Sequence, residues 1–393
     1  MTWQVLVRFF TLGWVCFGGP AAHIGYFRYT FVEQLRWLDE REFANLVAVS
    51  QFLPGPGSSQ LGFAIGHHKA GLSGAIAAFI GFTLPSFLLL YLFAITSSQF
   101  LHLDAVQGAI HGLKLLAVVI VADAVMALFT QFCHKLAARL IMLTATVALL
   151  LVPGTAAQML VLALAALAGW RWLSSDKHSP KGHDSSSLSG HGMTGINWWW
   201  LLAFALLLTL SLWQLTLASN GLMSIFAQFY QAGSLVFGGG HVVLPLLENS
   251  VGRSLSSDTF LSGYALAQAV PGPMFSVASF FGAQMWPQAP LMAALVATVA
   301  IFLPGFLLLL ALIGAWQALC RKPQVMAAVA GLNAAVVGVL LSTLYDPVFT
   351  SAVTDSLDMA LVLTGLALLR WFRPSILLLI ASFVVTGAAL AMI

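Results

Sequence analysis

The chain has 393 residues, of which 60% are hydrophobic and only 7% are charged, and its formal net charge is +3. So few charges cannot cover the surface of a soluble domain, and a small, scattered positive charge does not indicate nucleic-acid binding. The composition therefore predicts an integral membrane protein. Apolar runs of about 20 residues, without strand-like alternation, predict that it crosses the bilayer as α-helices.

Six apolar segments are expected in the first half, at about 2–20, 43–66, 71–97, 104–130, 137–152 and 154–172. Residues 174–196 are rich in Ser, Gly and His, and we expect them to form a flexible cytoplasmic linker whose histidines, His178, His183 and His191, are solvated rather than metal-bound. A connecting helix is expected at 197–218, because this apolar run opens with three tryptophans typical of a membrane interface. Six further segments follow at about 222–240, 259–284, 289–317, 324–344, 353–370 and 374–392, for about 13 membrane segments in all.

Three motifs occur twice, 217 to 220 residues apart. FGGP at 17–20 returns as FGGG at 237–240, VSQFLPGP at 49–56 returns as LAQAVPGP at 266–273, and LPSF at 84–87 returns as LPGF at 303–306. Such constant spacing indicates an internal duplication. We therefore expect an N-terminal repeat, 1–173, and a C-terminal repeat, 219–393, and the odd connecting helix between them would invert the second repeat relative to the first.

The distribution of Lys and Arg predicts the orientation. With the N-terminus in the cytoplasm, most of these residues, including Lys69, fall in cytoplasmic loops, whereas Arg28, Arg36 and Arg41 fall in an external loop that also carries acidic residues. We therefore expect a cytoplasmic N-terminus and a periplasmic C-terminus. The two PGP segments interrupt their helices, so either each crosses the membrane or each forms a re-entrant hairpin.

The helix breaks are where we expect the substrate-binding site. Proline removes a backbone donor and glycine permits unusual dihedral angles, so PGP stops a helix and restarts it. Irregular backbone at membrane depth persists only where it is buried in protein or lines a wet cavity, and a restarted helix directs free N–H groups and the positive end of its dipole into that cavity. The alternative is that these residues only kink helices for packing, which explains a duplicated set of breaks poorly.

Lys114 is the second feature that indicates a functional site, because a charged residue within an apolar run is functional by default. Its repeat equivalent is Asn333, so both halves place a hydrogen-bond donor at this point. Lys114 would face an anion cavity, or it would extend to the external interface while Asp123 caps a neighbouring helix. Gln51 and Gln268, three residues ahead of each PGP, would be polar ligands or contacts between helices.

These paired motifs, together with two homologous halves of opposite orientation, resemble the chromate ion transporter (CHR) superfamily in its long, two-domain form. The resemblance covers nearly the whole chain except the linker. It carries the family motif positions over to Phe17, Gly18, Gly19, Pro20, Ala22, His23, Ile24, Pro54, Gly55, Pro56 and Gly57. In the second half Gly240 stands where Pro20 would be, which leaves open whether the halves contribute equally. The resemblance implies a multi-pass protein of the bacterial inner membrane that exports chromate, with sulfate as a close chemical analogue, and confers chromate resistance.

The expected function is thus secondary active transport of a tetrahedral oxyanion, since the chain contains no GxxxxGK[ST] phosphate loop for an ATP-driven pump. A sulfate transporter, another anion transporter or an anion channel is the main alternative, and a membrane-embedded hydrolase of lipid head groups is a remote one. We assign no catalytic residue, no metal site and no cofactor, and we leave a homodimer open. The candidate substrate-binding residues are Gly18, Gly19, His23, Gln51, Gly55, Gly57, Ser58, Ser59, Lys114, Gly238, Gly239, His241, Gln268, Gly272, Ser276 and Asn333.

Overall fold

The computed structural model describes residues 1–17, 19–97, 104–173, 195–217, 221–236, 247, 251, 255–320, 322–372 and 374–392, and these residues form helices and no strand. The linker and its three histidines lie almost wholly outside them. The first half contains α1 (Thr2–Val15), α2 (Gly19–Phe27), the π-helix η1 (Arg28–Gln34), α3 (Glu40–Phe52), α4 (Gly57–Ser97), α5 (Asp104–Phe132), α6 (Leu136–Leu151) and α7 (Thr155–Trp172). After the connecting helix α8 (Trp198–Thr216), the second half contains α9 (Leu222–Ser234), α11 (Ser257–Ala269), η4 (Met274–Ser276), α12 (Val277–Met285), α13 (Pro290–Leu312), α14 (Trp316–Cys320), α15 (Pro323–Thr343), η5 (Leu344–Phe349), α16 (Thr350–Ala352), α17 (Ser356–Ala367), η6 (Leu368–Phe372) and α18 (Ile376–Leu390).

The first expected span, 2–20, is not one continuous helix. α1 ends at Val15, and α2 with η1 folds back along it, because the ring of Phe9 stacks on that of Phe31 with centroids 4.8 Å apart and meets that of Phe27 at 5.5 Å. In a continuous helix, residues 9 and 27 would be separated by about 27 Å. The chain therefore reverses at the FGGP motif and forms a first hairpin.

The first PGP segment also reverses the chain. α3 ends at Phe52 and α4 begins at Gly57, where a Cβ would lie 3.0 Å from the carbonyl oxygen of Ser50. α4 is itself two antiparallel arms, since Ala70 and Gly71 have non-helical dihedral angles. We refer to residues 57–69 as its short arm and to residues 72–97 as its long arm. A Cβ on Gly66 of the short arm would lie 2.4 Å from the Gly74 carbonyl oxygen of the long arm.

The second PGP segment forms the equivalent hairpin. Phe260 of α11 stacks on Phe281 of α12 with ring centroids 5.0 Å apart, although the residues are 21 positions apart in the chain. α12 then packs antiparallel to α13, where a Cβ on Gly282 would lie 2.6 Å from the Ala293 carbonyl oxygen. α3 and α11 have 13 residues each and are thus about 20 Å long, which is too short to cross the roughly 30 Å apolar core of a bilayer. Of the two arrangements open from sequence, the re-entrant hairpin is the one the structure contains.

This reversal corrects the predicted loop assignment. The ammonium group of Lys69 lies 5.0 Å from the ring centroid of Trp37, and the hydroxyl groups of Thr2 and Ser73 are 3.2 Å apart. The N-terminus, the loop around Trp37 and the turn of α4 therefore share one end of the molecule, and the prediction that the loop with Arg36 lies on the opposite side from Lys69 is wrong. Charge counting failed here because it assumed that the first segment crosses.

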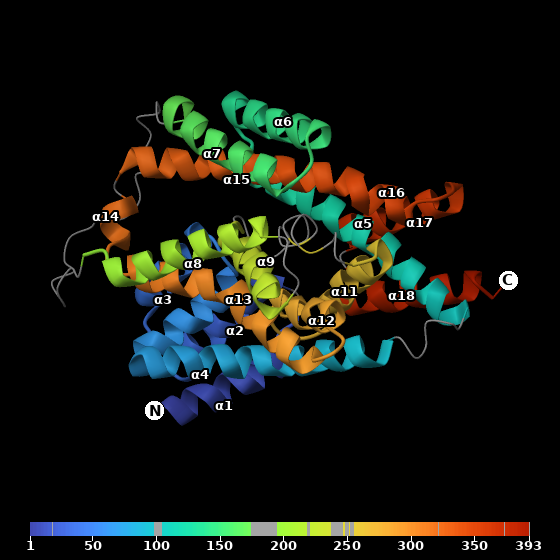
Figure 1. Ribbon diagram of the computed structural model, residues 1–393. Coiled ribbons are helices and arrows are strands. Elements are labelled where there is room, and N and C mark those ends of the chain that lie inside the picture. Colours follow the sequence, from blue (N-terminus) through green and yellow to red (C-terminus); the bar gives the residue numbers. More distant parts are fainter. Residues whose placement is uncertain are drawn as a thin grey trace.

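Equivalent helices of the two halves run in opposite directions. α12 runs parallel to the long arm of α4, as successive hydrogen bonds show: Ser276 to Ser86, Ser279 to Phe87, and Gln284 to Ala94. Because α13 is antiparallel to α12, it is also antiparallel to the long arm of α4, its repeat equivalent. The two halves are thus inverted repeats, as the sequence predicts, and the chain termini lie at opposite ends of the molecule (Figure 1).

The peripheral helices are exchanged between the repeats. α5 of the first half packs along α18 of the second, where a Cβ on Gly112 would lie 2.1 Å from the Phe383 carbonyl oxygen. Conversely, α15 packs along α6 and α7, with Gly331 of α15 against Gly169 of α7, and Figure 1 shows this layer along one edge of the molecule. Each repeat is therefore completed by helices from the other.

Five described helical stretches are long and apolar enough to cross a membrane: Gly57–Thr96, Asp104–Phe132, Trp198–Thr216, Pro290–Leu312 and Pro323–Ala352. The first of these includes the turn of α4, so its crossing part is the long arm. Four shorter apolar helices include α6 and α18. These helix lengths do not confirm the 13 membrane segments expected from the sequence, and that number stays a prediction.

Candidate functional site

Each PGP break is hydrogen-bonded to the other repeat. The Gly55 N–H in the first PGP segment donates a hydrogen bond to the Val236 carbonyl, 2.7 Å away, immediately before the second FGG motif. The Gly272 N–H in the second PGP segment donates to the Cys16 carbonyl, 2.8 Å away, immediately before the first FGG motif. Each PGP segment is therefore bonded to the residue that precedes the FGG motif of the other repeat, and the two bonds are reciprocal.

Glycine is required at both PGP positions. Gly55 has φ +125° and Gly272 has φ +98°, a backbone region that residues with a Cβ rarely adopt. A Cβ on Gly55 would also lie 2.8 Å from the Cα of Gly305 in the LPGF motif, while one on Gly272 would lie 3.1 Å from Ser86 Oγ in the LPSF motif. The third pair of motifs thus packs directly on the second.

The two repeats differ at the start of the restarted helix. In the second repeat, Ser276 Oγ is 2.7 Å from Ser86 Oγ, so both hydroxyl groups are hydrogen-bonded. In the first repeat, Ser59 is the equivalent of Ser276, but Gly305 stands in place of Ser86 and offers no hydroxyl group. The space beside Gly305 holds the Gln60 amide, whose Nε2 donates to the carbonyl oxygens of Pro54 and Gly305, each 3.0 Å away.

Buried polar atoms without a hydrogen-bond partner lie at both breaks, Ser59 and Gln60 at the first and His23 beside the second. They include Ser59 Oγ, Gln60 Oε1 and Thr83 Oγ1 among the described residues. His23 is 1% exposed and stands edge-on to Phe82, with the Cys16 carbonyl beside it, but neither ring nitrogen makes a hydrogen bond of ordinary geometry. Because unpaired buried polar groups are costly, these atoms point to a polar guest.

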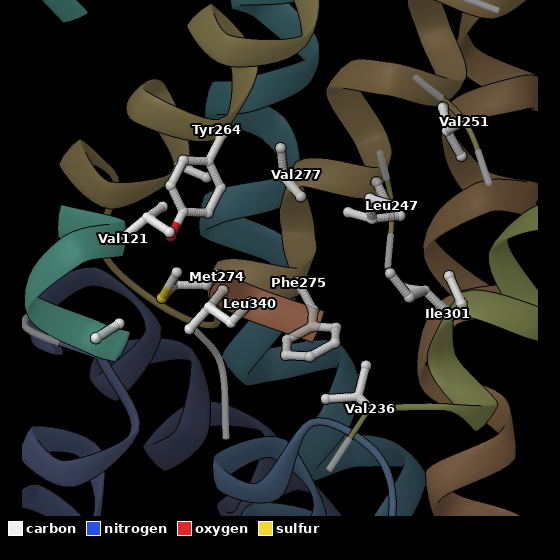
Figure 2. Close-up of a cluster of buried hydrophobic side chains, with 14 of the residues drawn as sticks. Val121, Val236, Leu247, Val251, Tyr264, Met274, Phe275, Val277, Ile301 and Leu340 are labelled. Atoms are coloured by element: carbon white, nitrogen blue, oxygen red, sulfur yellow. The ribbon is translucent and has the colours of Figure 1, made fainter. Parts of the chain in front are cut away.

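The second break is walled by apolar side chains. Figure 2 shows Met274 directed toward Leu340 of α15 and Phe275 directed toward Val236, with Tyr264 beside Val121 of α5. Met274 and Phe275 are 5% and 3% exposed. Helix starts held in such surroundings are poorly screened by water, so their dipoles act strongly on a nearby charge.

Lys114 makes a different contact from the one predicted. Its ammonium group is 2.7 Å from Asp258 Oδ1 at the start of α11, and the side chain of Asp258 is 69% exposed. Lys114 also precedes Val121 by seven residues, or about 10 Å along α5. The lysine thus carries its own counter-ion and lies two helical turns before the part of α5 that reaches the break. Asp123, which the alternative placed as a helix cap, pairs instead with Arg370, 3.1 Å away.

The remaining predicted residues are distributed as follows. Gly19 has φ +77° with nothing near its missing Cβ, Gly57 packs on Ser50, and Ser58 is buried at the start of α4. The amide of Gln268 lies beside the Tyr264 hydroxyl without a hydrogen bond of ordinary geometry, whereas its equivalent, Gln51, is exposed. Asn333 is half-buried on α15. Gly18, Gly238, Gly239 and His241 lie outside the described residues.

Sequence reasoning missed three residues at the first break and its partner, Gln60, Thr83 and Ser86. Ser86 lies within the duplicated LPSF motif, so the repeat offered a signal for it. Gln60 offered none, because its repeat equivalent is the apolar Val277.

Comparison with known proteins agrees with this architecture. The sequence model of the chromate transporter family matches residues 3–170 and 223–389, which are the two repeats. The chain is 29% identical over 366 residues to a chromate transport protein of Pseudomonas aeruginosa, covering 87% of this chain and 80% of that protein. It is 27% identical over 390 residues to a chromate transport protein of Cupriavidus metallidurans, covering 98% and 91%, and 26% identical over 350 residues to a probable chromate transport protein of Synechococcus elongatus, covering 86% and 82%. No solved structure matches the chain significantly. With both of its inverted repeats matched, the chain belongs to the chromate transporter family.

Proposed function

We propose that this protein exports chromate across the bacterial inner membrane as a secondary transporter, and thereby confers chromate resistance. The observation that carries the proposal is the reciprocal pairing of the breaks, Gly55 with Val236 and Gly272 with Cys16. Paired broken helices from inverted repeats are typical of transporters that bind their substrate where the repeats meet.

The chemistry of the breaks suits a tetrahedral dianion. The helices that restart at Gly57 and Met274 both begin at the breaks, so their free N–H groups and positive dipole ends are available to an anion. Residues 50–65 and 262–285, which contain both breaks, include no carboxylate. The site therefore offers donors without a competing negative charge.

Within this site, the first repeat would supply the side-chain donors. Ser59 Oγ is buried and unpaired, while its equivalent Ser276 is already bonded to Ser86. His23, also of the first repeat, lies beside the second break, and its ring nitrogens are free of ordinary hydrogen bonds. We propose that the anion binds on the Ser59 side and that the second repeat contributes mainly backbone and packing.

The membrane potential is sufficient to drive export. An inside-negative potential is worth about 2.3 kcal/mol per elementary charge per 100 mV, so a dianion leaving the cell gains about 4.6 kcal/mol. No nucleotide is then required. Sulfate, which has the same shape and charge, would compete for the site.

Inside-out membrane vesicles provide the test. Vesicles that contain the protein should accumulate chromate when a potassium gradient with valinomycin makes the lumen positive, and accumulation should saturate with chromate concentration and decline with added sulfate. Vesicles without the protein are the control. Uptake equal to that control would reject chromate transport, and uptake that does not saturate would indicate a channel. Saturable uptake of sulfate that excludes chromate would indicate a sulfate transporter.

A further inference from the structure

An ionisable pair links the two repeats away from the breaks. His111 Nε2 on α5 is 2.7 Å from Asp358 Oδ1 in the first turn of α17. The other carboxylate oxygen of Asp358 accepts hydrogen bonds from both the backbone N–H and the hydroxyl group of Thr354, at 2.9 and 2.8 Å. Asp358 is therefore held as a carboxylate, and Nε2 of His111 must carry the hydrogen that faces it.

The two partners differ in their access to water. The side chain of Asp358 is 7% exposed, whereas that of His111 is 34% exposed. A proton from solution would consequently reach the pair through the imidazole, at Nδ1, because Nε2 is occupied by the carboxylate. Adding this proton converts a neutral donor into an imidazolium beside a buried carboxylate and strengthens the contact, while its release to water weakens it.

The charges around His111 favour that exchange. Lys114 lies one turn further along the same face of α5, but Asp258 neutralises it. The other ionisable groups on elements packed near this part of α5 are acidic or phenolic: Asp104 on α5 itself, Tyr345 and Asp346 on η5, and Asp355 before α17. Within the described parts of η5, α16, α18 and the first half of α17 there is no Lys or Arg.

The position of the pair gives its protonation a mechanical effect. α5 belongs to the first repeat and α17 to the second, and among the described residues α5 makes three contacts between ionisable side chains to the second repeat: His111 with Asp358, Lys114 with Asp258, and Asp123 with Arg370. Of these three, only the His111 contact has an imidazole as its donor, while the other two have an ammonium and a guanidinium group. A movement that separates α5 from α17 would strain or break the His111 contact.

We propose that His111 and Asp358 form a proton-binding site whose occupancy changes during each transport cycle, so that anion transport is coupled to a proton. This inference rests on the proposed anion transport. The proton enters from water on the side to which His111 is open and is released to water on the opposite side when the repeats move, so no other reactant is consumed.

Purified full-length protein in liposomes loaded with a pH-sensitive dye would test the coupling, with chromate movement followed in parallel. In the wild type, chromate movement should be accompanied by about one proton per anion. H111Q keeps a side-chain N–H donor for Asp358 but cannot be protonated, and H111K keeps a permanent cation there. Both variants should move chromate with proton movement reduced at least tenfold. H134Q, which alters an exposed histidine beyond the other end of α5, should behave as the wild type.

Every other outcome rejects the proton site, the transport function or both. If the wild type moves chromate without protons, or if H111Q and H111K move protons as H134Q does, the proton site is rejected while the transport function stands. Loss of chromate movement in both His111 variants would also reject it, because the inference requires transport to survive without the proton. If the wild type moves no chromate, both the proposed function and this inference fail.

Discussion

At the scale of single residues, Gly55 and Gly272 occupy the most constrained positions of the site. Each combines a positive φ with a close neighbour on the other repeat, Gly305 or Ser86, and each donates its N–H across the repeat boundary. A side chain at Gly55 must displace the backbone of Gly305, and one at Gly272 would crowd the Ser86 side chain and the Phe82 carbonyl oxygen. These two glycines therefore fix how closely the repeats approach.

Replacement of Gly55 or Gly272 by valine should abolish chromate uptake while leaving membrane insertion largely intact. β-Branched residues tolerate a positive φ poorly, and the added atoms would meet the facing repeat. Uptake in vesicles, normalised to the amount of inserted protein, is the measurement. Gly25→Val is the matched control, since a Cβ on Gly25 has nothing within 4 Å. Normal uptake in Gly55→Val would reduce the motif to a packing role.

Ser59 and Ser276 offer a comparison within one molecule. Ser59→Ala should weaken chromate binding by about 1.5 to 3 kcal/mol, the range for a hydrogen bond to a charged group, because its hydroxyl group has no partner in the protein. Ser276→Ala should instead remove the hydrogen bond to Ser86, whose hydroxyl group would keep only the Thr83 carbonyl as partner, and lower stability with little change in affinity. Chromate titration and thermal unfolding of the purified variants separate the two effects. Equal losses of affinity would show that both repeats bind the anion alike.

At the scale of elements, α5 connects the two repeats through its side-chain contacts. The pair of Lys114 with Asp258 is one of these contacts. Lys114 is largely buried, but Asp258 is exposed, so water screens the pair. Exposed pairs contribute only about 0 to 1 kcal/mol. The pair therefore orients the start of α11 more than it stabilises the fold.

Lys114→Met should consequently change chromate affinity by less than about 1 kcal/mol, or roughly fivefold. A double-mutant cycle with Asp258→Asn should show that the two substitutions are not additive in thermal stability, because they remove the same contact. A loss of affinity near 3 kcal/mol in Lys114→Met alone would place the ammonium group in the anion site, as the sequence suggested.

The helical breaks show what a sequence can and cannot predict at this scale. The first FGG motif and the two PGP motifs follow the ends of α1, α3 and α11, because proline and glycine impose local dihedral angles that depend on no partner. In contrast, the break at Ala70 and Gly71 has no duplicated motif, and both LPxF motifs lie within helices. The direction in which the chain leaves each break is a matter of tertiary packing: Phe9 on Phe31 and Phe260 on Phe281 close the hairpins, and apolar residues of this kind read equally well as part of a crossing helix. The pairing of Lys114 with Asp258, 144 residues away, likewise has no local signature.

At the scale of the whole molecule, the hairpins place the N-terminal end of the chain on one side. α4 reaches the other side only through its long arm, and α5 and α17 both begin there, joined by His111 and Asp358. Inverted repeats, the inserted helix α8 and the membrane environment were all predictable, because they depend on composition and spacing over long segments. The hairpins at the first FGG motif and at the PGP segments were not, since a helix that turns back and one that continues differ in packing rather than in hydrophobicity.

Cysteine labelling can check this arrangement. Probes at Arg36 and Ser73 should react with an impermeant maleimide from the same side of the membrane, and a probe at Thr354 should react from the opposite side. Background labelling of Cys133 should be slow, because burial raises the pKa of its thiol despite the nearby Arg139 and keeps it protonated at neutral pH. Opposite accessibility of Arg36 and Ser73 would restore a first segment that crosses the membrane.

The reciprocal bonds from Gly55 to Val236 and from Gly272 to Cys16 also bear on the origin of the chain. An ancestor consisting of one repeat could not complete its own break and would have needed a second copy inserted upside down in the same membrane. Joining the copies through α8 made their one-to-one ratio and opposed orientation permanent. After this fusion, the two copies no longer had to keep the same sequence. Equivalent positions could then differ, as Ser86 in the first half and Gly305 in the second do.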